Sequence, residues 1–153
     1  MSSSSSSDVA FAPGGVDPTF LRRFEDSFLG AMETVLEGMG TTRAELEQTI
    51  RDTGEIRVLL VDGEDAGSLW IELRERTLHV HALLLDPAFR RRGVGSRVLS
   101  LLEDEYLGRA DELELGVQEG NEPAERLYEK AGFVEVGADA DLGFRVLRRA
   151  LPH

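Results

Sequence analysis

The chain has 153 residues, a formal net charge of −12 and no cysteine. This length suits one domain around a single core, and the lack of cysteine excludes disulfides, thiolate metal ligands and a cysteine nucleophile. The acidic balance argues against a nucleic-acid partner, because a protein that neutralises phosphates needs a basic face. Lys130 is the single lysine, so the basic residues are almost all arginine. This bias has two equally good explanations, which are a halophile with a high-salt cytoplasm or a GC-rich genome.

The chain begins with a serine run, residues 2–7, which has no apolar neighbours to offset the entropy of ordering. We therefore expect residues 1–15 to form a disordered tail and residues 16–153 a single domain, with residues 9–11 as a candidate short first strand. The run lacks the basic region and apolar stretch of a secretory signal, and no apolar run is long enough to span a membrane. We expect a soluble cytoplasmic protein without a membrane partner.

Two helices are predicted ahead of the main sheet. Asp17 followed by Pro18 is a favourable helix start, and apolar residues on one stripe predict a helix over residues 17–38. Thr42 and Glu45 have the spacing of a capping box, which opens a second helix that closes near Gly54.

Three strands follow. Residues 56–61 and 67–74 have the pattern of a hairpin around a turn at Asp62 and Gly63. A third strand, residues 77–85, ends in three leucines. Because these leucines are apolar toward both faces, we expect a central strand that is covered on both sides.

The rest of the chain alternates between helices and strands. A helix runs from residue 94 to near Gly108, and a strand follows over residues 113–117. Asn121 caps a helix that ends at Gly132. Two closing strands, 133–136 and 143–151, are separated by an acidic loop over residues 137–142. The order predicts an α/β (α+β) fold, a central mixed β-sheet flanked by about four helices.

A basic, glycine-bearing loop stands between the third strand and the following helix, with the sequence Arg90-Arg91-Arg92-Gly93-Val94-Gly95. A strand that turns into a helix presents free backbone N–H groups and the positive end of the helix dipole, which suits a phosphate or pyrophosphate. Arginine adds charge in a geometry that matches phosphate oxygens. A dinucleotide-binding loop requires a third glycine where Val98 stands, and no Gly-Lys-Ser/Thr follows as in a P-loop.

These residues resemble the GCN5-related N-acetyltransferase (GNAT) family, whose pyrophosphate loop has the form Arg/Gln-x-x-Gly-x-Gly/Ala. A second family signature follows at the expected distance, Asn121-x-x-Ala124-x-x-Leu127-Tyr128-x-x-x-Gly132-Phe133. The resemblance covers roughly residues 20–150. It implies the GNAT fold, acetyl-CoA as co-substrate and no metal.

The resemblance also implies which residues hold coenzyme A. The backbone at the end of the third strand contacts pantetheine, and the loop binds the pyrophosphate. Asn121 contacts pantetheine from the other side, and Tyr128 lies near the sulfur, where it can protonate the departing thiolate. The predicted strand-end and loop positions are Leu83, Leu84, Leu85, Arg90, Arg91, Arg92, Gly93, Val94, Gly95 and Ser96.

The general base is less clearly indicated. Relatives that acetylate ribosomal or other protein N-termini carry a glutamate where this chain has Gly116. Instead, His79 and His81 are similar to the two histidines on the same strand of arylalkylamine N-acetyltransferases, and the pKa of histidine suits proton transfer near neutrality. Glu72 on the neighbouring strand is the second candidate for the base. The alternative for the histidines is that they only pack or cap.

The resemblance predicts an N-acetyltransferase that transfers acetyl to a primary amine of a small molecule or peptide by direct attack in a ternary complex. A catalytically weak acyl-CoA-binding regulatory module of the same fold is the alternative, since Gly116 stands where some relatives carry a glutamate. A nucleotide-binding protein is disfavoured by the glycine pattern. A homodimer remains an open option.

Overall fold

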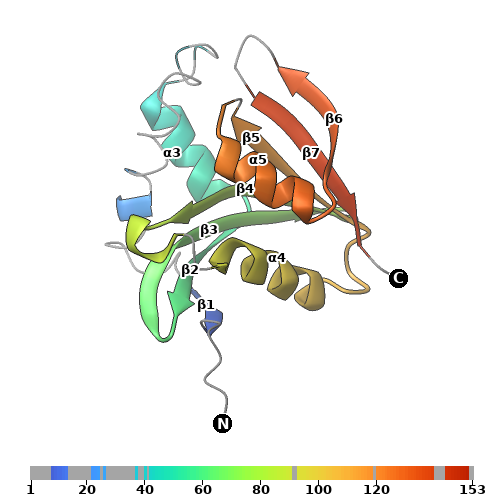
Figure 1. The fold of residues 1–153 in the computed structure, drawn as a ribbon. Coiled ribbons are helices and arrows are strands. Elements are labelled where there is room, and N and C mark those ends of the chain that lie inside the picture. The colour runs from blue at the N-terminus through green and yellow to red at the C-terminus, as the bar shows by residue number, and fades with distance from the viewer. Residues whose placement is uncertain are drawn as a thin grey trace.

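Strands form one mixed sheet (Figure 1) in the computed structural model, which describes residues 8–13, 22–24, 26, 37, 40, 42–90, 93–118, 120–139 and 144–151. Within these residues the strands are β1 (Val9–Pro13), β2 (Glu55–Val61), β3 (Glu64–Arg74), β4 (Thr77–Leu85), β5 (Glu112–Gln118), β6 (Val134–Asp139) and β7 (Phe144–Ala150). Their order across the sheet is β1-β2-β3-β4-β5-β7-β6. Neighbouring strands are antiparallel, except that β4 and β5 are parallel.

Helices cover both faces of this sheet. The described helices are α3 (Arg43–Asp52), α4 (Val94–Glu105), α5 (Glu122–Lys130) and the short 3-10 turn η1 (Pro87–Phe89). Helix α4 makes the crossover that two parallel neighbours such as β4 and β5 require. It lies beside α5 on one face, while α3 lies on the other (Figure 1). None of the described helices is long and apolar enough to cross a membrane.

The larger core fills the space between the sheet and the pair α4 and α5. Residues at helical spacing on α4, including Val94, Val98 and Leu102, pack on alternate residues of the central strands such as Leu78 and Leu113. A smaller core lies under α3 and is built on Trp70 of β3. The indole N–H donates to the Thr53 carbonyl at 2.7 Å, so the buried ring leaves no polar atom unpaired. Trp70 is therefore a core residue.

The predicted fold class and most predicted elements are confirmed. Thr42 and Glu45 form the reciprocal hydrogen bonds of a capping box at α3. Asp62 and Gly63 both have positive φ, 52° and 84°, as a two-residue hairpin turn requires. The short first strand is present as β1, and it places residues 9–13 of the predicted tail in the sheet. Residues 22–24, 26 and 37 are helical as predicted, and the rest of the helix over 17–38 lies outside the described residues.

The largest differences between predicted and observed boundaries occur at three positions. Strand β3 begins at Glu64, immediately after its turn, and α4 ends at Glu105 instead of near Gly108. The prediction of a loop over residues 137–142 is wrong at its start, because β6 continues to Asp139. A bulge between Glu135 and Gly137 keeps the glycine-containing segment in register with β7.

Candidate active site

The parallel strands β4 and β5 pair over only part of their length. Their ladder runs from Thr77 opposite Glu112 to Val80 opposite Leu115. Beyond that point residues 81–85 continue in register with β3, and residues 116–118 continue in register with β7. The inner edges of both strands therefore carry backbone groups that the described ladders leave unpaired, which a ligand can use.

A bulge marks the place where the two strands part. Trp70 of β3 lies opposite Ala82 and Ile71 lies opposite Val80, so His81 is the extra residue in β4. A bulge of this kind bends its strand and increases the local twist. The site is thus created by one residue in the middle of the most central strand.

Helix α4 begins just past the end of β4, and its N-terminus carries no side-chain cap. Gly93 is the N-cap with φ of 73°, and the first turn has no acidic residue. Helices α3 and α5 are instead capped by Thr42 and Asn121. The first N–H groups of α4 and its dipole therefore suit an anion. Arg90 turns back toward the strand, and its Nε donates to the Leu85 carbonyl at 3.2 Å. Arg91 and Arg92 lie outside the described residues.

Gly95 lets α4 approach α5 closely. A Cβ atom at this position would lie 2.6 Å from Cδ2 of Leu127 on α5, so any larger residue displaces that side chain. Oδ1 of Asn121 accepts from the N–H of Ala124 at 3.4 Å, which confirms the predicted helix cap. The predicted contact of Asn121 with pantetheine stays a prediction, as do the backbone contacts of the three leucines at the end of β4.

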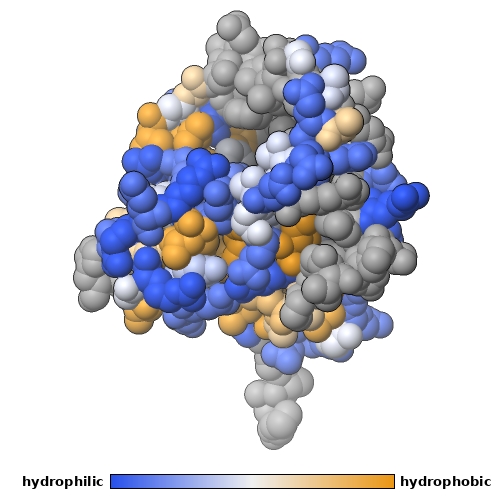
Figure 2. All heavy atoms as spheres, turned by 180° about the vertical axis from the view of Figure 1, so that it is seen from behind, coloured by the Kyte–Doolittle hydropathy of each residue, from blue (hydrophilic) through white to orange (hydrophobic). Residues whose placement is uncertain are grey.

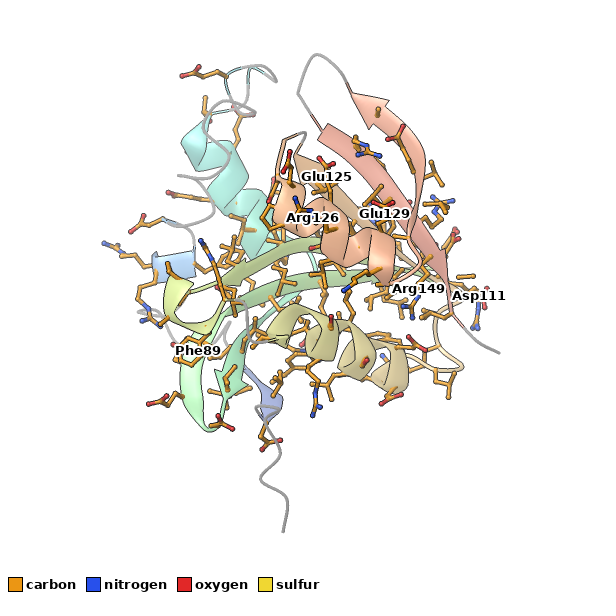
Figure 3. All side chains as sticks on the ribbon, viewed as in Figure 1. Phe89, Asp111, Glu125, Arg126, Glu129 and Arg149 are labelled. Atoms are coloured by element: carbon orange, nitrogen blue, oxygen red, sulfur yellow. The ribbon has the colours of Figure 1, made fainter. Side chains whose placement is uncertain are left out.

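A shallow groove of about 210 Å³ runs between α4 and α5, continuing from Ser96 toward the C-terminal end of α5. Arg149 of β7 lies at that end (Figure 3) and donates to the Ala131 carbonyl at 2.9 Å. It also pairs with Glu103 of α4, so it ties both helices to the sheet. The groove is lined by Ser96, Leu99, Ser100, Leu127, Lys130, Ala131 and Arg149.

Tyr128 is buried in the core on the α4 and α5 side of the sheet, 8% exposed, with its ring edge-on to Phe133 at 5.6 Å between centroids. Burial raises the pKa of its hydroxyl above the ordinary value. Burial is the single cause of this shift, so no charge or hydrogen bond of another described residue contributes to the pKa of the hydroxyl. A hydroxyl that stays protonated and is free to donate is what a general acid requires.

The two histidines lie on the opposite face. Along β4 their positions alternate with Leu78 and Val80, which belong to the same core as Tyr128. Nε2 of His81 lies 2.8 Å from Oε1 of Glu72, a hydrogen bond across β3 and β4. The structure therefore brings together three of the predicted catalytic residues and places Tyr128 across the sheet from them, with the parted strands between.

The charges around His81 decide its protonation. Burial lowers the pKa of His81, and its hydrogen bond to Glu72 opposes this only in part. The pKa of Glu72 is lowered mainly by its hydrogen bond to Arg74, whose guanidinium nitrogen is 2.8 Å away. At neutral pH this pair is a neutral imidazole beside an ionised carboxylate.

Several residues of this face were not predicted from the sequence. Nδ1 of His79 lies 3.2 Å from Oε1 of Glu114 on β5, and Nε of Arg148 on β7 donates to the same carboxylate at 3.1 Å. The Trp70 ring covers His81, with 4.6 Å between centroids. The signal for Glu114 was in the sequence, because alternation with Leu113 and Leu115 places it on the face away from the main core. Within the described residues no group of three potential metal ligands occurs.

Solved structures share the overall fold of this chain. The acetyltransferase from Thermus thermophilus has a TM-score of 0.69 at 18% identity, covering 94% of this chain and 97% of that chain. The ribosomal-protein-S18-alanine N-acetyltransferase from Escherichia coli has a TM-score of 0.64 at 18% identity, covering 95% of each chain. At these identities the similarity shows the fold alone, which is that of the N-acetyltransferases.

The model of the acetyltransferase (GNAT) family matches residues 20–133. The chain belongs to this family. Among curated proteins it is 32% identical over 104 residues to a mycothiol acetyltransferase from Clavibacter michiganensis subsp. michiganensis. That match takes in 64% of this chain and 34% of the relative, so the chain corresponds to about a third of the relative's length.

Proposed function

We propose that this protein is an acetyl-CoA-dependent enzyme that transfers acetyl directly to a primary amine of a small molecule or peptide in a ternary complex. One observation carries the proposal: the parted strands β4 and β5 separate an uncapped helix N-terminus from a face that holds His79 and His81. A donor and an acceptor that approach from these two sides meet between the strands.

The donor side follows from the backbone. The N–H groups at the start of α4, from Val94 to Ser96, provide donors for a pyrophosphate without a competing side-chain cap. The free inner edge of β4 at residues 83–85 provides peptide groups for the amides of pantetheine. These two features support coenzyme A more than a nucleotide alone, because the second one has no counterpart in a nucleotide site.

The proposed reaction moves two protons from the amine. An ammonium group R–NH₃⁺ gives one proton to His79 or His81, and its nitrogen then attacks the acetyl carbonyl carbon. The carbon–sulfur bond breaks and its electron pair leaves with the sulfur. Tyr128 donates its proton to this thiolate and recovers the second proton from nitrogen. Because tyrosine has a pKa of about 10 and a thiol about 8.5, the donation requires that recovery in the same step.

The acceptor class rests on two further observations. The mycothiol acetyltransferase relative supports a small-molecule acceptor. Gly116 lies on the same face as the histidines, and a Cβ atom there would meet only the Arg145 carbonyl, at 3.9 Å. The missing side chain leaves room for an acceptor beside the parted strands, where N-terminal acetyltransferases of the family carry a glutamate.

Two measurements on the purified protein test this proposal. Calorimetry should detect binding of acetyl-CoA but not of ATP or NAD, and a thiol-release assay across a panel of amines should then show turnover. Gly95→Trp should abolish acetyl-CoA binding, because the indole would fill the space between α4 and Leu127. Asp104→Trp, at an exposed site on the same helix, is the control and should bind normally.

Unchanged acetyl-CoA affinity in Gly95→Trp would contradict the placement of the donor. Tight acetyl-CoA binding without thiol release for any amine would instead support the regulatory module, for which the glycine at position 116 is the specific observation.

A further inference from the structure

Three residues on the histidine face are linked by hydrogen bonds, and two of them, Glu72 and Arg74, have no role in the reaction proposed above. Arg74 and Glu72 come from β3, and His81 comes from β4. The guanidinium of Arg74 and Nε2 of His81 each lie 2.8 Å from the same oxygen, Oε1 of Glu72. The role inferred for these three residues rests on the proposed function, but their geometry does not depend on that function.

The hydrogen bonds fix which nitrogen of His81 is free. Arg74 holds Glu72 as a carboxylate, and a carboxylate only accepts hydrogen bonds. Nε2 of His81 must therefore carry the hydrogen that it shares with Glu72, and the lone pair of the neutral ring is on Nδ1. Nδ1 is the nitrogen that can accept a proton.

Packing fixes the orientation of the same ring. Trp70 covers one side of His81 with centroids 4.6 Å apart, and His79 is stacked nearby with centroids 6.0 Å apart and planes 14° apart. His79 differs in its polar contact, because its Nδ1 lies 3.2 Å from Oε1 of Glu114 on β5. The bulge places His81, and not His79, where β4 leaves β5.

We propose that His81 is the residue that takes the proton from the acceptor amine, and that Glu72 is a positioning residue that holds Nε2–H of His81 while Arg74 keeps the carboxylate ionised. Glu72 does not act as the base, because its hydrogen bonds with Arg74 and His81 stabilise the carboxylate and lower its pKa. The proton from R–NH₃⁺ goes to Nδ1 of His81, which becomes an imidazolium between the Glu72 carboxylate and the Trp70 ring.

Charged and titratable groups face His81 from several of the described strands. They are Glu72 and Arg74 on β3 and His79 on β4, and beyond His79 the pair formed by Glu114 of β5 and Arg148 of β7. Removing the negative charge of Glu72 lowers the pKa of His81, whereas removing the positive charge of Arg74 raises it. The two substitutions therefore shift the pKa of His81 in opposite directions.

The test is the dependence of kcat/KM on pH for Glu72→Gln and Arg74→Gln in the 153-residue chain, with thiol release as the readout. We expect the acid limb to move to lower pH by about one unit in Glu72→Gln and to higher pH in Arg74→Gln. Arg76→Gln is the matched control, since Arg76 lies in the turn that follows Arg74 and pairs with Asp111. Its profile should match the unsubstituted protein.

Loss of the acid limb in Glu72→Gln would identify Glu72 as the base and overturn the proposal. A lower rate with an unmoved limb would reduce Glu72 to a structural role and would also overturn it. A second readout needs no turnover: ¹⁵N NMR of the histidine rings, assigned with His79→Gln and His81→Gln, should show the proton of neutral His81 on Nε2. A proton on Nδ1 would refute the arrangement even if acetyl transfer is confirmed, and a protein without transfer would leave this readout intact.

Discussion

The two faces of the sheet differ in what they bury. On the face under α4 and α5, alternate residues of the central strands such as Leu69, Leu78 and Leu113 are fully buried in one apolar core. On the other face, the same strands carry His79 and Glu114, which contact each other beside the smaller core around Trp70. The side of the molecule turned away from α4 and α5 accordingly shows hydrophilic residues over much of its surface, with apolar residues between them (Figure 2).

The apolar face is held by close packing, whereas the polar face is held by hydrogen bonds and ion pairs. The apolar face fixes the start of α4 and the position of Tyr128 by close packing. On the polar face, burial lowers the pKa of His81, and the hydrogen bond from Arg74 lowers the pKa of Glu72. Because strand residues alternate between faces, one strand such as β4 serves both purposes.

The largest effect is expected where the apolar face contributes chemistry. Tyr128→Phe should lower turnover by about 10²- to 10⁴-fold, because the thiolate loses its proton donor. Acetyl-CoA affinity measured by calorimetry should stay near that of the unsubstituted protein, since the ring and its contact with Phe133 are retained. An unchanged turnover would remove the acid role and leave Tyr128 as a core aromatic residue.

A smaller effect is expected for the packing of that face. Leu102 of α4 is fully buried, and Leu102→Ala should lower the free energy of unfolding by about 2–5 kcal/mol through the cavity that it leaves. Ser100→Ala, at an exposed position on the same helix, should change it by less than about 0.5 kcal/mol. Urea unfolding of both variants at one pH measures the difference. Equal losses would mean that α4 is not anchored by this face.

The smallest effect is expected on the polar face, and it depends on pH. The pKa of His81 is lowered from 6.5 in the fold, so below pH 6.5 the unfolded chain binds a proton that the folded chain does not. Stability should therefore fall as the pH drops from 6.5 toward the lower folded pKa. The lowered pKa of Glu72 stabilises the fold above its ordinary value of 4.5, and this contribution is lost only in more acidic solution.

His81→Gln should flatten the loss of stability just below pH 6.5, whereas Leu102→Ala should lower stability by the same amount at every pH. Thermal unfolding at a series of pH values distinguishes the two patterns. A slope that is unchanged in His81→Gln would show that His81 is not held neutral by burial.

Much of this site could be predicted from the sequence because its parts are local. The capping box at Thr42, the turn at Asp62 and the cap at Asn121 depend on residues within a few positions of each other. The glycine pattern of the loop after β4 likewise depends on one strand-to-helix connection. Two such motifs in order are enough to indicate the family from the amino-acid sequence alone.

The remaining parts depend on strands that are distant in the sequence. The pairing of Glu72 with His81 requires the register of β3 on β4, and that register shifts by one residue at the bulge. The contact of His79 with Glu114 requires β5 to lie parallel to β4, 35 residues further along the chain by their paired positions Thr77 and Glu112. No pattern within β4 alone carries this information.

The sequence by itself determined the order of the elements, the glycine pattern of the loop after β4 and the family, because backbone chemistry and side-chain periodicity depend on neighbouring residues. Only the tertiary structure decided that β4 and β5 part at His81. It also decided that the Glu72 carboxylate, paired with Arg74, is hydrogen-bonded to one nitrogen of that histidine. Those two facts depend on strand register and on burial, which arise when segments far apart in the chain pack together.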